Sequence, residues 1–545
     1  MNIKQKINKQ FNIWALLSYV FISLILIPNI VIAFEIFSEP NENWAHIKEY
    51  LLADIVYNTV VIAGFTALFT MIIGTSLAWI VTAYDFPYRK FFRWALILPL
   101  AIPPFIGAYT YHGMLNYTGV IQSFLRNQLG LTVNQAYFNI MSEQGAIFIF
   151  TMFLYPYVFV ITKSFFENQA ASIVENAQLL GANSIEIFVR IIFPIARAAI
   201  LGGMTIVILE VINDYGVVKY FGIQTFITAI FQTWFGMGDL DSSFKLAGTL
   251  MVFVMAVLIT EKLLRGRKRF SYASSKIKPI QPKKVSKRTS HALFWYCSVI
   301  FSLSFLIPFS QLVYWMIQTF DKIWTDEFYT LISHSFIVAA IAAITIVFVA
   351  LVIANYSRLY AGLLSNTISK LTVIGYSIPG AVIAIGVITV FISFDQFNHW
   401  LFNLLNLQPL FVFRTSLFML VFAYIIRFLA VGYNSIEAGF EKTGTKFTDV
   451  ALTLGASPLR TFFVVDIPLI RGAVLGGFIL VFVDVLKELP LTMLLQPFNF
   501  HTLATKAFVY ANDEMINEAA SASVLIILIS ALCILSLHSV LDRER

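Results

Sequence analysis

The chain carries one short polar stretch twice, as ENAQLLG at residues 175–181 and as DVALTLG at residues 449–455. A proline follows each glycine at the same distance, as Pro194 and as Pro468. At this fixed offset, 13 of the 42 positions in residues 175–216 are identical, which is too many for a shared apolar bias alone. The sequence therefore predicts two homologous halves, each with the same polar segment between long apolar runs.

The composition excludes a water-soluble globule. Hydrophobic residues make up 59% of the chain, charged residues only 12%, and the mean hydropathy is +0.79, whereas about a quarter of a typical soluble domain is charged. Apolar runs of roughly 20 residues can each cross a bilayer as a helix. We expect an all-α polytopic membrane protein with about twelve spans, six per half, near residues 13–34, 58–80, 94–114, 145–162, 195–218, 244–264, 292–318, 332–355, 371–393, 411–433, 470–495 and 519–540.

The basic residues indicate the orientation. If the N-terminus is cytoplasmic, 29 of the 37 Lys and Arg residues, Arg427 among them, fall on the cytoplasmic side, as the positive-inside rule requires. We therefore expect both termini and both repeated stretches to face the cytoplasm. Because both halves then run in the same sense, the repeats are parallel and related by an axis along the membrane normal.

The sequence divides into a first repeat at 1–264, a linker at 265–290 and a second repeat at 291–545. Eleven Lys and Arg residues and no acidic residue crowd into 262–290, which favours a cytoplasmic segment that contacts anionic lipid. Topology and lipid contact account for the net charge of +7, so we expect no nucleic-acid partner. Cys297 and Cys533 lie in apolar spans and indicate neither a disulfide framework nor a metal site.

The repeated stretch itself suggests a compact surface feature. Residues 174–180 can form a short helix that Gly181 ends, because glycine accepts the left-handed conformation of a helix stop. A second short helix at 183–193 would lead to Pro194, which suits the first turn of the next membrane helix. A generic solvated helical hairpin is the alternative, but duplication at fixed spacing argues against it.

The pattern of an acid, small residues, a glycine and a proline resembles the cytoplasmic signature of ATP-binding-cassette (ABC) importer permeases. The first copy departs from it at Asn176, and the second at Val450 and at Asp449. The resemblance implies a type I ABC importer-like fold with two docking loops, at about 164–194 and 436–468. The residues that it assigns to ATPase docking are Glu175, Ala177, Gly181, Pro194, Asp449, Ala451, Gly455 and Pro468.

The same resemblance implies that the chain is a transport subunit and not an enzyme. The motif G-x-x-x-x-G-K-[ST], which cradles ATP phosphates, is absent, since Thr445 stands where the lysine should be in the nearest string. ATP would be used by separate cassette ATPase subunits, expected as a homodimer, and this chain would bind no cofactor. The loops would transmit closure of those subunits to the membrane halves of a bacterial inner-membrane importer.

The fusion of two halves in one chain, and the segments at 210–226 and 484–505, resemble ferric iron importer permeases. A periplasmic or lipid-anchored binding protein would then deliver the iron. Thiamine or an aminophosphonate remains an alternative cargo for the same architecture. A secondary transporter driven by an ion gradient would also have twelve spans and two repeats, but it would not need the duplicated loops.

Two trios of polar residues stand at equivalent positions inside apolar runs: Glu210, Asn213 and Asp214 in the first half, and Asp484, Lys487 and Glu488 in the second. The spacing i, i+3, i+4 predicts that each trio shares one helical face. Ionised groups at membrane depth cost roughly 2.5–3.5 kcal/mol or more, so they should face protein or water. They indicate either a gate or cation route, or an ion pair between helices, such as Lys487 with Asp484 or Glu488, that holds the halves together.

Other candidates carry less weight. Pro103 and Pro379 each interrupt the third span of their half and predict a structural kink. His112, Tyr109 and Tyr111 could offer metal ligands near the outer side, but isolated residues of this kind are more often structural. We therefore assign no metal site from the sequence.

Overall fold

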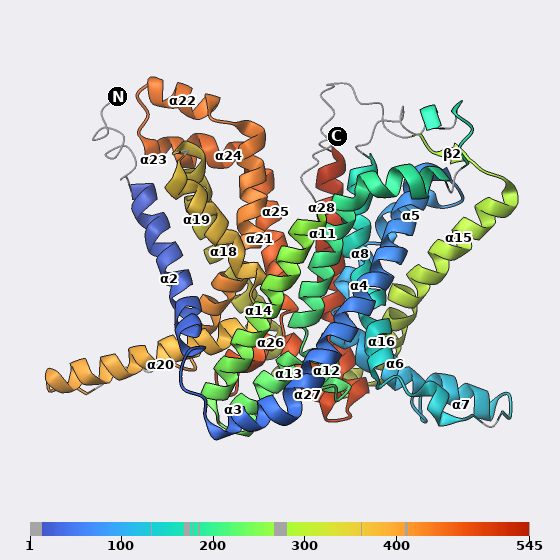
Figure 1. Cartoon of the computed structure of the whole chain (residues 1–545), viewed down its shortest axis with the longest axis horizontal. Helices are drawn as coiled ribbons and strands as arrows, with labels where there is room; N and C mark the ends of the chain where they lie inside the picture. The colour runs from blue at the N-terminus through green and yellow to red at the C-terminus, as the bar shows by residue number, and fades with distance from the viewer. Residues whose placement is uncertain are drawn as a thin grey trace.

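A computed structural model describes residues 13–543 apart from 132, 168–174, 178, 184–185, 266–280, 361 and 409–412. Within these residues, ten helices are long and apolar enough to cross a membrane, and twelve spans result when each of two bent pairs counts as one. The helices stand side by side, with α22 (Lys446–Thr453) at one end of the bundle and α27 (Leu503–Asn512) at the other (Figure 1). The predicted all-α architecture is confirmed.

The elements of the first half follow in the order expected from the apolar runs. They are α2 (Ile13–Glu35), α3 (Glu42–His46), α4 (Leu52–Ala83), α5 (Arg89–Ala95), α6 (Pro104–Leu115), α7 (Val120–Asn127), α8 (Glu143–Glu167), α11 (Phe193–Asn213), α12 (Gly216–Tyr220), α13 (Phe226–Phe231) and α14 (Leu240–Arg265). Short 3₁₀ and π-helical turns, such as η2 (Leu98–Ala101) and η4 (Ile187–Ile192), join or interrupt them.

The second half repeats this order. It contains α15 (Lys287–Phe301), α16 (Ile307–Gln318), α17 (Phe320–Ile323), α18 (Asp326–Leu359), α19 (Leu363–Ile374), α20 (Gly380–Leu404), α21 (Leu417–Thr443), α22, α23 (Pro458–Thr461), α24 (Ile467–Leu469), α25 (Arg471–Leu486), α26 (Pro490–Leu495), α27 and α28 (Ile516–Arg543). The turns η6 (Ser302–Leu306), η7 (Gly375–Ser377) and η8 (Phe462–Asp466) are part of it.

The third span of each half is broken at its proline. Pro103 and Pro379 take nearly the same backbone conformation, with φ and ψ of −55° and 139° and of −56° and 139°. Each stands just before the next helix, because proline lacks the N–H that an interior helical position must donate. In the first half the two helical pieces lie at 90° to each other. The predicted kink is therefore a complete break.

The fifth span of each half ends earlier than the apolar pattern predicts. Helix α11 ends at Asn213 and α25 ends at Leu486, whereas the apolar runs continue to about 218 and 495. The short helices α12 and α26 begin within the remaining part of each run, and α13 and α27 follow beyond it. Each half thus places a polar helix end inside the bundle.

The first helix of each half packs against the other half. Helix α2 meets α18 through Tyr19 and Tyr356, whose hydroxyl oxygens lie 3.3 Å apart, and the rings of Trp14 and Phe462 lie 4.5 Å apart. In the second half, Tyr296 of α15 bonds to Ser76 of α4, with 2.8 Å between the hydroxyl oxygens.

The described end of the linker also contacts the first half. Residues 283–284 (β2) pair in parallel with residues 84–85 (β1), which follow α4. The opening helix of the second half, α15, begins three residues later. The covalent connection is therefore held beside the first half before the second half starts.

Candidate functional site

The second docking loop closes its helix with the predicted glycine stop. Gly455 has a φ of +87°, and the backbone N–H of Ala456 donates to the carbonyl of Ala451 at 3.1 Å. This six-to-one bond satisfies a carbonyl at the end of α22, as in a Schellman motif. Leu454, at the turn, is 82% exposed.

The first docking loop closes in the same way. Gly181 has a φ of +86°, and the N–H of Ala182 donates to the carbonyl of Ala177 at 3.0 Å. Leu179 and Leu180 beside it are 85% and 87% exposed. Both loops thus present exposed leucine at a left-handed turn, at the end of the bundle that carries α22. Exposed apolar side chains that gather at one place are typical of a protein contact surface.

The segment after the glycine differs between the loops. In the first, η4 runs into α11 without a break and Pro194 lies in the first turn of α11. In the second, Pro468 lies in the first turn of α24, and a bend of 77° separates α23–α24 from α25. In the first loop, the second helix predicted at 183–193 therefore continues directly into the membrane span. The first helix, predicted at 174–180, includes residues 174 and 178, which lie outside the described residues. The second loop also begins later than predicted, since α21 extends to Thr443.

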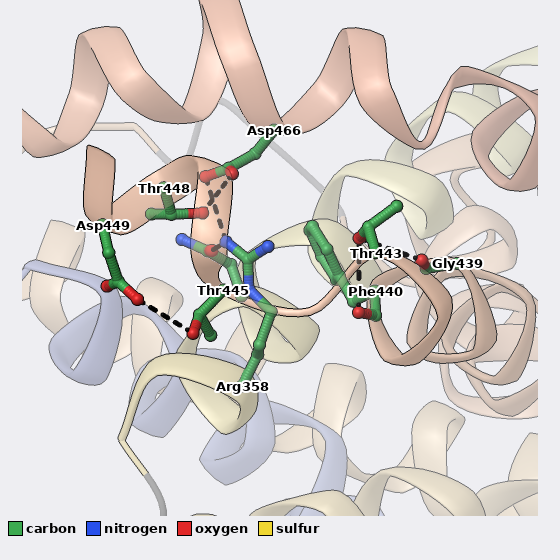
Figure 2. Close-up of polar contacts among 9 residues, drawn as sticks. Arg358, Gly439, Phe440, Thr443, Thr445, Thr448, Asp449 and Asp466 are labelled. Carbon is green, nitrogen blue, oxygen red and sulfur yellow. Dashed lines mark hydrogen bonds and ion pairs between the residues drawn. The ribbon is translucent and has the colours of Figure 1, made fainter. Parts of the chain in front are cut away.

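The acids of the two loops are both exposed. Asp449 stands in the first turn of α22, where the helix dipole favours a negative charge, and accepts a hydrogen bond from Thr445 Oγ1 at 3.1 Å (Figure 2). Glu175 lies at the equivalent position of the first loop.

A cavity of about 120 Å³ between the two halves brings together all six polar residues predicted from the apolar runs. The first half contributes Glu210, Asn213 and Asp214, and the second half contributes Asp484, Lys487 and Glu488. The breaks at Pro103 and at the end of α11 and α25 open this space in the middle of the bundle.

The prediction that each trio shares one helical face is wrong. Only Glu210 and Asn213 lie within α11, and only Asp484 lies within α25, because both helices end at this point. Asp214 and Glu488 follow the helix ends and accept hydrogen bonds from the short helices beyond them.

Asp214 and Glu488 act as caps. Asp214 Oδ1 accepts from the N–H of Val217 at 2.7 Å. The two carboxylate oxygens of Glu488 accept from the N–H groups of Leu491 and Thr492, each at 2.9 Å. Free N–H groups of a helix start that are satisfied by a carboxylate stabilise the helix. These two carboxylates therefore hold α12 and α26 in place.

Glu210 and Asp484 make different contacts. They occupy equivalent positions of the repeat, and each faces the cavity. Tyr376 of the second half donates its hydroxyl to Glu210 Oε1 at 2.9 Å, which joins the two halves. Lys487 Nζ lies 3.0 Å from Asp484 Oδ1. This ion pair lies within the second half, so it does not hold the halves together as predicted.

Sequence analysis missed Arg427 as a cavity residue. The count of basic residues places it on the cytoplasmic side, but it is only 6% exposed and lines the cavity. Its Nη1 donates at 2.6 Å to the carbonyl of Ile378, which lies at the break of the third span. An arginine inside a predicted span was the available signal, since such residues face protein or water.

Of the three outer candidates, His112 and Tyr109 both lie beside Tyr220, whereas Tyr111 does not share this contact. His112 Nδ1 lies 2.7 Å from the hydroxyl of Tyr220, and the ring of Tyr109 is 6.4 Å from that of Tyr220. Tyr111 instead donates to the carbonyl of Leu303. In the part of the chain that the structure describes, no group of three or more His, Cys, Asp or Glu side chains could hold a metal ion.

A family model described as binding-protein-dependent transport system inner membrane component matches residues 71–260 and 346–545. The chain belongs to this family of transport permeases. The two matched segments correspond to the two structural repeats, so the permease has the tandem type I ABC permease fold. It is a multi-pass inner-membrane protein and a transport component.

Relatives of this permease extend over most of its length. It is 24% identical to the Fe(3+)-transport system permease protein FbpB 2 of Haemophilus influenzae, over 88% of each chain. It is 21% identical to the ferric transport system permease protein FbpB of Actinobacillus pleuropneumoniae, over 88% of this chain and 71% of that one. A shorter match, at 24% identity over 37% of this chain and 73% of the other, is to the spermidine/putrescine permease PotB of H. influenzae.

Proposed function

We propose that this permease imports ferric iron across the bacterial inner membrane, powered by ATP hydrolysis in a separate pair of identical cassette ATPase subunits. A periplasmic or lipid-anchored binding protein would deliver the iron to the end that carries α27. Both termini and both docking loops would face the cytoplasm. The chain itself would bind no cofactor.

The observation that carries the proposal is the charge balance of the central cavity. Its lining contains four carboxyl side chains and only two cationic ones, Lys487 and Arg427. Asp214 and Glu488 cap helices. Glu210 and Asp484 do not, so each could exchange its present partner, Tyr376 or Lys487, for a passing cation. Carboxylate oxygens suit hard cations, and a path that binds its ion weakly releases it faster.

The relatives named for ferric transport support iron as the cargo over thiamine or an aminophosphonate. The similarity to the Fe(3+)-transport permease FbpB 2 covers 88% of this chain, so it includes residues of both repeats. The exposed leucines beside Gly181 and Gly455 support the docking of an ATPase pair, since two equivalent loops suit two equivalent subunits.

The test is uptake of radioactive iron into proteoliposomes that contain the permease, its ATPase and its binding protein. We expect uptake only with ATP. Uptake should fall about tenfold or more in Glu210→Gln and in Asp484→Asn, because each variant loses a carboxylate of the kind that suits a hard cation. Asp54→Asn, at an exposed position of α4, is the matched control and should transport normally. Uptake without the ATPase would overturn the proposal in favour of a secondary transporter.

A further inference from the structure

A second polar cavity, of about 280 Å³, lies at the end of the bundle that carries α27. The beginning of α18 and the segment from Asn499 to α27 form its walls. Its polar lining includes Lys322, Thr325, Glu327, His501, Lys506 and Tyr510. Most of these side chains can donate hydrogen bonds, and Glu327 is the only carboxylate among the lining residues.

Lys506 is the central cation of this outer cavity. Its side chain is 22% exposed, and its Nζ lies 3.7 Å from Glu327 Oε1, while Glu327 itself is 86% exposed. At this distance the pair is too long for a strong charged hydrogen bond. The ammonium also lies 4.9 Å from the centre of the Tyr510 ring. Lys322, in contrast, is closely paired with Glu518 at 2.6 Å. Lys506 is therefore a largely enclosed charge whose partner is loosely held.

His501 adds a second unmet donor or acceptor. Its Nδ1 is buried and, within the described residues, has no hydrogen-bond partner. Burial, and then the charge of Lys506, lower the pKa of His501, which indicates that an additional positive charge is disfavoured there. A negative ligand would relieve this repulsion and would supply oxygen atoms to both side chains.

We propose that the outer cavity is a binding site for a small oxyanion, held by Lys506 and His501. The hydroxyl groups of Thr325 and Tyr510 in the lining would donate further hydrogen bonds to the anion. The negatively charged oxygen atoms could belong to a free anion or to an acidic side chain of the delivering protein. This inference stands on the lining of the cavity and does not depend on iron being the cargo.

The test uses the full-length permease in detergent, with inorganic phosphate and acetate as probes at constant ionic strength. Binding is measured by calorimetry and by the shift in thermal unfolding temperature. We expect saturable binding of at least one probe, weakened about tenfold by Lys506→Gln, because the variant loses a hydrogen bond from a charged donor. Lys506→Arg should retain binding. Lys219 lines a different cavity, beside α12 and α13 of the first half. Lys219→Gln is the matched control and should bind as the native protein does.

Two measurements distinguish the sources of the anion: the probe concentration at saturation, and competition between phosphate and the delivering protein. Saturation below about 1 mM would identify a free anion, since the interaction would then exceed about 4 kcal/mol. Weaker saturation, together with competition by phosphate against capture of the delivering protein, would identify an acidic side chain. The proposal is overturned if neither probe saturates, or if Lys506→Gln binds as tightly as the native protein.

Discussion

Arg358 and Asp466 form a buried ion pair at the base of the second docking loop, with 3.0 Å between Arg358 Nη2 and Asp466 Oδ2. Figure 2 shows the guanidinium group between Asp466 and the ring of Phe440, whose centre is 4.1 Å away. Thr448 Oγ1 donates to the other oxygen of Asp466 at 2.6 Å. These contacts tie α22 and η8 to the C-terminal ends of α18 and α21. The equivalent positions of the first half are Tyr84 and Ile192, which cannot form this pair.

We predict that Arg358→Gln reduces stability by about 3–5 kcal/mol, because it leaves Asp466 as an unpaired buried charge. ATP-dependent uptake should fall with it, since the loop would lose its attachment to α18. Unfolding in detergent, followed by circular dichroism, measures the stability.

The matched control is Arg93→Gln, which removes an ion pair with Glu167 in the first half at 2.7 Å. Its arginine is 37% exposed, so its loss should cost no more than about 1 kcal/mol. Equal losses in the two variants would contradict the special role of the Arg358 pair. The double variant Arg358→Met with Asp466→Leu should recover most of the stability, because no uncompensated charge remains.

The left-handed backbone conformation of Gly455 can be tested by substitution. A Cβ added at Gly455 would meet no atom within 4 Å, so any cost of Gly455→Val arises from the backbone conformation. That cost is roughly 1–2 kcal/mol for a residue other than glycine or asparagine. We expect Gly455→Val to co-purify less ATPase, while Gly455→Asn retains it. Gly64→Ala, at an uncrowded helical position of α4, is the control. Equal co-purification by the valine and asparagine variants would argue against the helix stop.

The pair of Asp484 and Lys487 can be tested with a double-mutant cycle. Lys487→Gln alone leaves Asp484 without its cation, whereas Asp484→Asn with Lys487→Gln removes both charges. We expect a coupling energy in stability of about 0.5–3 kcal/mol, as for contacting residues. Transport should not be restored in the double variant if Asp484 meets the cargo. Full transport by the double variant would leave the pair a structural role only.

Asp239 lies outside the membrane spans, and its lowered pKa predicts that the stability of the permease depends on pH. Burial alone would raise its pKa, but hydrogen bonds from Ser242, Asn43 and Asn41 hold the pKa below the ordinary value. A carboxyl group with a lowered pKa contributes stability that is present above its unfolded pKa of about 4 and is lost as pH falls through the folded pKa.

Asp239→Ala should therefore destabilise the permease by about 1 kcal/mol at neutral pH, the usual cost of losing a helix cap. The difference from the native protein should shrink below about pH 4. Thermal unfolding across this pH range measures it. Asp241→Ala, at an exposed neighbouring position, should show no such pH dependence; a constant difference at Asp239 would contradict the argument.

The membrane spans and the helix stops can be predicted from the sequence, because they depend on the length of an apolar run or on a single residue. Apolar length predicts the spans, and glycine at 181 and 455 predicts the left-handed stops, because these depend on hydrocarbon thickness and on one residue's backbone. The convergence of Glu210 and Asp484 follows from the repeat itself.

The remaining features depend on contacts that no local pattern encodes. Helices α11 and α25 end early because Asp214 and Glu488 cap the next helices. The length of an apolar run does not predict such a cap. The sequence around Arg427 predicts only its side of the membrane, because its partner is a backbone carbonyl at a break 49 residues earlier in the chain. The pair of Arg358 and Asp466 unites two helices of one half and has no counterpart in the repeat.

The exchange of opening helices has a consequence for assembly. Helix α2 of the first half packs against α18 of the second, and α15 of the second half packs against α4 of the first. A break in the chain between α14 and α15 would leave two fragments that remain interlocked, so a nicked permease should migrate as one particle until the bilayer or detergent is removed.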